Sequence, residues 1–203
     1  MLHQMLLSRL IAAASALIFS VLSFVAPPQR VADEGTVVRV GLCFGETAKR
    51  SVTVRASGGF TLGRAEENGW TALLTTECET IVVSRRIARP VTGDSRYKNA
   101  SAAAEAAAQS GGTVLYENGA YAVAEGLSPA AAEPLFVVAD ESGKPLFLYA
   151  GEEALTLAAG AAIEFPADET LYSYRGRVEC IPDGTRFSVV NAVGLEDYVK
   201  GVL

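Results

Sequence analysis

The apolar positions of this chain follow three patterns, one after another. Leu10 to Ala26 forms an uncharged apolar run. From residue 36 onward, short alternating apolar and polar segments are separated by Gly, Asn and Asp, which is typical of half-buried strands. The last nine residues carry apolar side chains at helical spacing. The patterns predict an α+β fold, rich in strands, behind an N-terminal signal or anchor helix.

The first 32 residues have the layout of an export signal. Met1 to Arg9 holds one basic residue and no acid, and the apolar run that follows ends at Pro27 and Pro28. The run has 17 residues, close to the ~20 that a membrane-spanning helix needs. Because small residues are poorly placed for cleavage near Ala26 and Ala32, a cleaved signal and an uncleaved anchor both remain open. We expect an extracytoplasmic protein, either secreted or membrane-anchored.

Residues 36–92 are expected to form a β-rich unit. Asn68-Gly69 is the strongest hairpin signal in this part. Trp70, the single tryptophan, is interpreted as a packing residue of the core or its rim. The expected strands are Thr36 to Phe44, Ser51 to Ala56, Phe60 to Leu62, Trp70 to Leu74 and Glu79 to Ser84.

Residues 93–160 are expected to form a small α+β insert. Asn99 to Gln109 is almost pure alanine, and it predicts a helix capped by Asn99 or Ser101 and closed by glycine. The helix is so poor in large side chains that it should pack on a sheet. A second, short helix is predicted at Ser128 to Glu133. The predicted hairpins join Thr113 to Tyr116 with Ala120 to Ala124, and Leu135 to Ala139 with Pro145 to Tyr149.

Residues 161–203 combine a hairpin with a helix. Leu171 to Cys180 alternates as one strand, and Arg186 to Val193 returns after the turn at Pro182 to Gly184. Leu195, Tyr198, Val199 and Val202 then fall on one face of a helix. No Gly, Asn or Pro stops this helical pattern, so we expect the domain to continue beyond Leu203.

The charge of the exported part argues against nucleic acid as a partner. Fifteen of the 17 Lys and Arg and all 23 Asp and Glu lie from Asp33 onward, which gives that part a net charge of −8. Phosphate backbones are bound by clustered Lys and Arg, and an acidic domain repels them.

Several kinds of catalytic site are missing from the sequence. The sole histidine, His3, lies in the export segment, which excludes Ser-His-Asp, Cys-His and His-ligated zinc systems from the rest. Glycine motifs for phosphate are absent too, so we expect neither cofactor nor metal. Cys43, Cys78 and Cys180 form no C-x-x-C, and they are either three free thiols or one disulfide with an odd cysteine. Acid–base chemistry must therefore use carboxylates, tyrosines or lysines.

One set of motifs in the C-terminal third has a familiar order. It comprises Tyr174-Arg175-Gly176, then Val189 to Val193 around Asn191, then Leu195-Glu196-Asp197-Tyr198, then Gly201-Val202. This pattern resembles the stage II sporulation protein D (SpoIID)/amidase-enhancer family. Val38 to Leu42 is similar to the family's opening strand, and the alanine helix with Tyr121 to Val123 is similar to a sporulation-related glycan-binding repeat.

The resemblance implies a peptidoglycan-active protein of spore-forming bacteria. Members are lytic transglycosylases that cleave glycan strands without stem peptides, or they are enhancers of an amidase. The implied partners are glycan strands, an amidase or other sporulation cell-wall proteins, and the membrane through the N-terminal segment. The family's catalytic glutamate lies in a P-x-E-M motif after the Gly-Val pair, so it is expected beyond Leu203. The motif residues expected at the substrate cleft are Tyr174, Arg175, Gly176, Asn191, Leu195, Glu196, Asp197, Tyr198 and Gly201.

Two of these residues have alternative interpretations. Glu196 starts a helix and lines the cleft, or it is itself the catalytic acid. We favour the first, because the positive start of a helix favours a charged carboxylate, whereas a catalytic acid must be held in its protonated form by burial. Asn191 lies between a strand and a helix, where its amide can satisfy backbone groups. The acid pairs Glu66-Glu67 and Glu152-Glu153 are interpreted as solvated turn residues.

Overall fold

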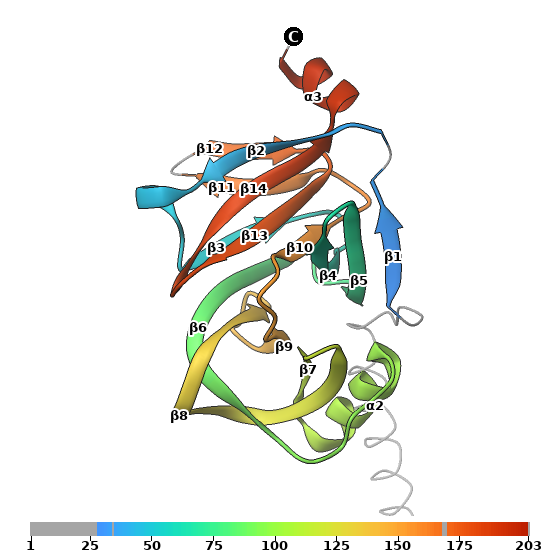
Figure 1. Cartoon of the computed structure of the whole chain (residues 1–203), viewed down its shortest axis with the longest axis vertical. Coiled ribbons are helices and arrows are strands. Elements are labelled where there is room, and N and C mark those ends of the chain that lie inside the picture. The colour runs from blue at the N-terminus through green and yellow to red at the C-terminus, as the bar shows by residue number, and fades with distance from the viewer. Residues whose placement is uncertain (1–27, 34, 168–169, 203) are drawn as a thin grey trace, which may run out of the picture.

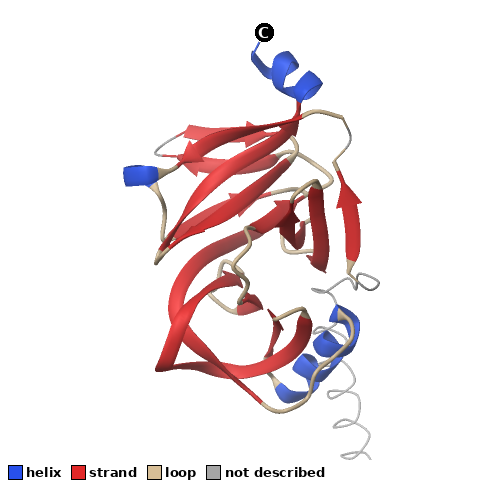
Figure 2. Cartoon of the chain, in the orientation of Figure 1, coloured by secondary structure: helices blue, strands red, loops and turns tan. Residues whose placement is uncertain are grey.

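The computed structural model describes residues 28–33, 35–167 and 170–202, and most of them lie in strands (Figure 2). The strands form two seven-stranded sheets, accompanied by the helices α2 (Ala100–Ser110) and α3 (Leu195–Val202) and the 3-10 turn η1 (Gly45–Thr47). The expected β-rich α+β fold is therefore correct at this level. The predicted signal or anchor run lies outside the described residues.

The first sheet is antiparallel throughout. The strands of the C-terminal hairpin lie beside the opening strand of the β-rich unit, so segments far apart in sequence meet here (Figure 1). Its order is β1 (Gln29–Ala32), β5 (Gly69–Thr76), β4 (Phe60–Glu66), β10 (Leu155–Ala158), β13 (Arg177–Asp183), β14 (Arg186–Gly194) and β2 (Val37–Cys43).

The second sheet curls at one end. Its order is β12 (Thr170–Tyr174), β11 (Ile163–Ala167), β3 (Ser51–Arg55), β6 (Thr80–Thr92), β8 (Ala120–Ala139), β7 (Thr113–Glu117) and β9 (Pro145–Tyr149). β7 pairs with the start of β8, β9 pairs with the end of β8, and β7 and β9 pair in parallel. These three strands therefore close on one another at the end opposite α3 (Figure 1).

The main core lies between the two sheets. Side chains from the first sheet, such as Leu62 and Val178, belong to one buried cluster with Val54, Ile81 and Ile163 of the second. A smaller apolar cluster, which includes Leu115, Leu135 and Leu148, fills the closed β7–β8–β9 part. Burial of these side chains is the main stabilising term.

The alanine helix forms as its sequence predicts. Asn99 caps it by accepting a hydrogen bond from the Ala102 amide at 2.9 Å, and Gly111 ends it in the left-handed region at φ 72°. Its buried alanines lie against β7 and β8, so the helix does pack on a sheet. Both predicted hairpins of the insert are confirmed as well.

The prediction of a short helix at Ser128 to Glu133 is wrong. These residues belong to β8, which pairs with β6. Ser128 pairs with Arg89, and Glu133 pairs with Ala88. Residues 129–132 bulge out between these pairs. Six residues are too few to stabilise a helix alone, whereas strand pairing satisfies the flanking backbone groups.

Two further boundaries differ from the prediction. Leu171 to Cys180 is not one strand, because the chain turns at Gly176 and passes from β12 in the second sheet to β13 in the first. The last four of the 32 residues assigned to the export segment form strand β1, which pairs with β5. An alternating pattern does not indicate which sheet a strand joins. Strand β1 is too short to produce an alternating pattern at all.

The three cysteines are free thiols, which settles the choice left open by the sequence. Cys43 and Cys180 are buried, and burial raises the pKa of the Cys180 thiol. In the described part of the chain, no helix has the length and apolar content that crossing a bilayer requires.

Candidate functional site

The predicted Tyr-Arg-Gly motif forms the turn between β12 and β13. Gly176 has φ 81°, a conformation that disfavours side chains. A Cβ atom at this position would lie 2.3 Å from the carbonyl oxygen of Ala192. Glycine is therefore required twice, for its backbone conformation and for the close approach of β14.

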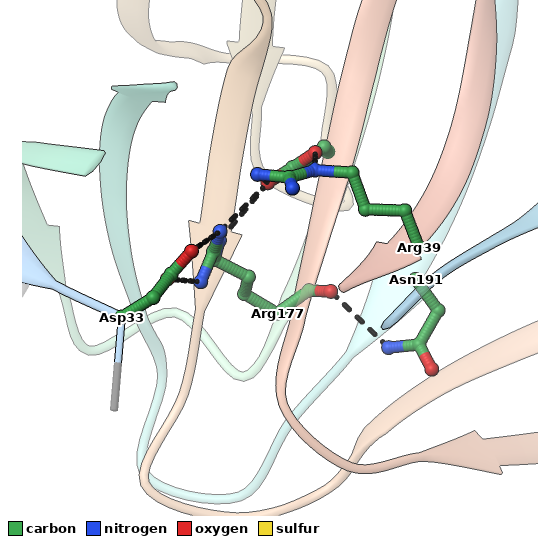
Figure 3. A network of polar contacts seen from close by, with 5 residues as sticks. Asp33, Arg39, Arg177 and Asn191 are labelled. Carbon is green, nitrogen blue, oxygen red and sulfur yellow. Dashed lines mark hydrogen bonds and ion pairs between the residues drawn. The ribbon is translucent and has the colours of Figure 1, made fainter. Parts of the chain in front are cut away.

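Asn191 of β14 holds this turn in place. The residue is 5% exposed, and its Nδ2 donates to the carbonyl oxygens of Arg175 at 2.8 Å and Arg177 at 3.1 Å. Figure 3 shows Asn191 reaching the backbone of Arg177. The side chain thus satisfies backbone groups, although at the turn between β12 and β13 and not at the start of α3.

Replacing Asn191 should therefore destabilise the protein. We expect Asn191→Ala to lower the free energy of unfolding by about 1–2 kcal/mol, because two carbonyl oxygens lose their donor. The measurement is a urea titration followed by circular dichroism. Asn68→Ala, at an exposed turn position, is the matched control and should change stability by less than about 0.5 kcal/mol. Equal midpoints for the two variants would contradict this account of Asn191.

The first turn of α3 is tied to the same motif. Arg175 Nη1 lies 3.3 Å from Asp197 Oδ1, and the two side chains are 66% and 49% exposed. An exposed pair of this kind adds at most about 1 kcal/mol, so it orients the turn more than it stabilises it. Leu195 and Tyr198 of α3 are exposed, as is Gly201.

Glu196 lies in an environment unsuited to a catalytic acid. Its side chain is 93% exposed, and its nearest charged partner is Lys200 one helical turn away at 3.9 Å. A general acid for glycan cleavage needs a site that shields it from water. The geometry therefore agrees with the interpretation of Glu196 as a helix-start residue.

A buried ion-pair network begins one residue after the turn, and our sequence reasoning missed it. Arg177 and Glu179 of β13 are 8% and 2% exposed. Glu179 accepts hydrogen bonds from Arg177 Nε and from Arg39 Nε, each at 3.0 Å, and Arg177 also contacts the carboxylate of Asp33 (Figure 3). The hydrogen bond to Glu179 raises the pKa of Arg39. The network joins the segment between β1 and β2 to the motif hairpin.

The signal for this network was present in the sequence. Arg177 and Glu179 are separated by one residue, with apolar Val178 and Cys180 in alternation, so they share one face of β13. Such charges are normally assigned to solvent. Their burial depends on Asp33 and Arg39, whose pairing with them no local pattern reveals.

Two tyrosines lie at the free edge of the second sheet beside the motif turn. The rings of Tyr172 and Tyr174 are stacked, with centroids 6.5 Å apart and an angle of 28° between the planes. Tyr172 is 47% exposed, whereas Tyr174 packs partly on the main core, and burial raises the pKa of its hydroxyl. The pair forms an aromatic ridge on β12.

The structure thus gathers the sequence-predicted residues at one end of the molecule. Tyr174, Arg175, Gly176 and Asn191 form and brace the turn, and Asp197 connects it to α3. The described residues contain no group of three or more His, Cys, Asp or Glu arranged to hold a metal ion. No protein-family model matches the chain, and no curated protein or solved structure matches it significantly.

Proposed function

We propose that this chain is the glycan-binding, N-terminal part of a SpoIID-type lytic transglycosylase that acts on peptidoglycan strands lacking stem peptides. The observation that carries the proposal is the braced end just described. The residues that resemble the family's motifs lie together there, beside an exposed aromatic ridge.

The aromatic ridge is suited to bind a sugar polymer. An exposed aromatic ring offers a flat apolar face, and the C–H faces of pyranose rings pack on such surfaces. Tyr172 and Tyr174 present two rings in nearly parallel planes on one strand, and the Arg175–Asp197 pair supplies polar groups next to them. Rings on a paired strand lose little entropy on binding, which favours recognition.

The proposed chemistry needs a further residue. In this scheme the catalytic glutamate follows α3 along the chain and donates a proton to the glycosidic oxygen as general acid. The motif turn and α3 would position the glycan strand against this glutamate. The ion pair between Arg175 and Asp197 orients α3 relative to the aromatic ridge. It would therefore also orient the glutamate that follows α3.

A second candidate function is a non-catalytic peptidoglycan-binding protein or amidase enhancer. It is favoured by the state of Glu196, the one glutamate among the expected cleft residues, which is exposed and pairs with Lys200. For both functions we propose an extracytoplasmic location and export through residues 1–32. Cell-wall glycan is the partner of the first function, and an amidase is an additional partner of the second.

The glycan-binding proposal is tested by removing the exposed ring. We expect Tyr172→Ala to weaken binding of the full chain to purified, peptide-free glycan strands by roughly three- to tenfold, the scale of one aromatic contact. Co-sedimentation with insoluble strands measures the effect. Leu171→Ala is the matched control, since Leu171 is equally exposed on the opposite side of β12 and should leave binding unchanged.

Two results would count against the proposal. Wild-type chain that stays in the supernatant would refute glycan binding, and an equal loss in both variants would show that the tyrosines have no special role. Release of soluble fragments distinguishes the two functions: a form extended through a Pro-x-Glu-Met motif should release them, and its Glu→Gln variant should not. A binder or enhancer releases none in either form.

A further inference from the structure

A concave site lies away from the motif turn. It is a cleft of about 870 Å³ between the closed β7–β8–β9 part, the strand β6 and the loop that joins β9 to β10. Volumes of this size are typical of pockets for small ligands and short peptides. None of the motif residues discussed above lines it.

Three arginines from two strands line this cleft. Arg64 comes from β4, and Arg85 and Arg89 come from β6. Arg64 Nε and Arg85 Nη1 are shielded from water and have no hydrogen-bond acceptor among the described residues. Burial lowers the pKa of Arg85, whose guanidinium lies 4.7 Å above the ring of Phe136.

These arginines have hydrogen-bonding capacity to spare. Among the described residues, the Arg85 side chain makes one hydrogen bond, from Nε to the carbonyl oxygen of Gly184 at 2.9 Å. The Arg64 side chain makes only long contacts with them, 3.4 Å to Glu66 and 3.5 Å to Glu153. The Arg89 side chain is exposed and has neither an ion pair nor a hydrogen bond within the described part of the chain. A guanidinium with free donors binds carboxylates through two parallel hydrogen bonds.

Glutamates supply the opposite charge in the lining of the cleft. Glu133 and Glu152 are exposed, and Glu117 is half-buried. Among the described residues none of these three has a cationic partner, whereas Glu153 is occupied by Arg64 and by the Tyr149 hydroxyl at 3.2 Å. The lining of the cleft therefore offers both free cationic and free anionic groups.

The backbone of the cleft wall is strained at one position. Ala131, in the bulge of β8, has φ 48°, a left-handed conformation that costs an alanine about 1–2 kcal/mol. Strain of this kind persists where the surrounding structure fixes it, and it is concentrated at binding sites. The bulge places Ala131 and Glu133 on the cleft and breaks the regular pairing of β6 with β8.

We propose that this cleft binds a short peptide that carries both a free carboxylate and a free amine. The carboxylate is held by Arg89 and Arg85, and the amine is held by the glutamates of the lining. A ligand with both charges matches the mixed lining, which would repel a simple anion at its glutamates and a simple cation at its arginines. This proposal is independent of glycan binding at the aromatic ridge.

A stem peptide released from cell-wall material is such a ligand, and a free amino acid carries the same two charges. The probe is trialanine in three forms, with free ends, with an acetylated amine and with an amidated carboxylate, titrated calorimetrically into the full chain. Free trialanine should bind, and each blocked form should bind roughly tenfold more weakly, because one charge-assisted contact is lost. A stem tripeptide released from purified peptidoglycan and free alanine distinguish the sources.

Arg89→Gln and Arg86→Gln are the paired variants. Both arginines are exposed on β6, but only Arg89 lines the cleft. Arg89→Gln should weaken binding of free trialanine roughly tenfold, and Arg86→Gln should leave it within about twofold. The proposal is overturned if trialanine does not bind, if blocked and free forms bind equally, or if the two variants lose affinity alike. Tyr172→Ala should not change peptide binding, so failure here is separable from failure of the glycan proposal.

Discussion

Arg177→Met should lower the free energy of unfolding by roughly 3–5 kcal/mol, the cost of removing one partner from a buried ion pair. Arg177 contacts both Glu179 and Asp33, and Glu179 is only 2% exposed. Methionine keeps most of the side-chain length but offers no donor. Chemical denaturation monitored by circular dichroism measures the loss.

Two further variants give this prediction its controls. Arg39→Met removes the more exposed partner of Glu179, because the Arg39 side chain is 41% exposed. This substitution should cost only about 1 kcal/mol. In the double variant Arg177→Met with Glu179→Met, both charges of β13 are gone, so part of the lost stability should return, although Asp33 still lacks its arginine. A double variant as unstable as Arg177→Met would mean that lost packing, and not the stranded carboxylate, causes the effect.

Gly176→Ala should be nearly as damaging, at roughly 3–4 kcal/mol. A left-handed backbone costs an alanine about 1–2 kcal/mol, and overpacking adds about 1–3 kcal/mol. The added Cβ would lie 2.3 Å from the Ala192 carbonyl oxygen, so the turn must shift away from β14. This shift also breaks the hydrogen bonds that Asn191 donates, and binding to glycan should fall together with the melting temperature.

Gly184→Ala separates the two contributions. Gly184 also has positive φ, 55°, but a Cβ added there meets no atom within 4 Å. Its substitution should therefore cost only the backbone term of about 1–2 kcal/mol. If both variants lose the same stability, the close approach of β14 to the turn is not what requires glycine at 176.

The sequence predicted the elements of this fold better than their arrangement. Alternation located most strands, and Asn99 with Gly111 marked both ends of the alanine helix. The passage from β12 to β13 was missed, because alternation continues through Arg175 and Gly176 while the chain changes sheet. The helix predicted at Ser128 to Glu133 failed for a related reason. Pairing with β6 outweighed the helix propensity of three alanines.

For the candidate site, too, the residues were predicted better than their contacts. The motif residues were named from sequence, and the structure brings Tyr174, Arg175, Gly176 and Asn191 together with Asp197. The partners of Asn191 were only partly foreseen, since a hydrogen bond to a turn on another strand has no local signature. The cleft was invisible for the same reason: Arg64, Arg85 and Glu152 are far apart in sequence and meet only in the folded chain.

The early start of β1 limits how far an anchored form of this protein can reach. Three peptide steps lead from Ala26, the end of the apolar run, to Gln29, the first residue of β1. Fully extended, they span only about 10 Å. The chain joins the folded domain directly after these three steps, because β1 pairs with β5 and Asp33 contacts Arg177. In an anchored protein the domain would stay at the bilayer surface. The glycan strands that it could then reach would be those of the innermost layer of the cell wall.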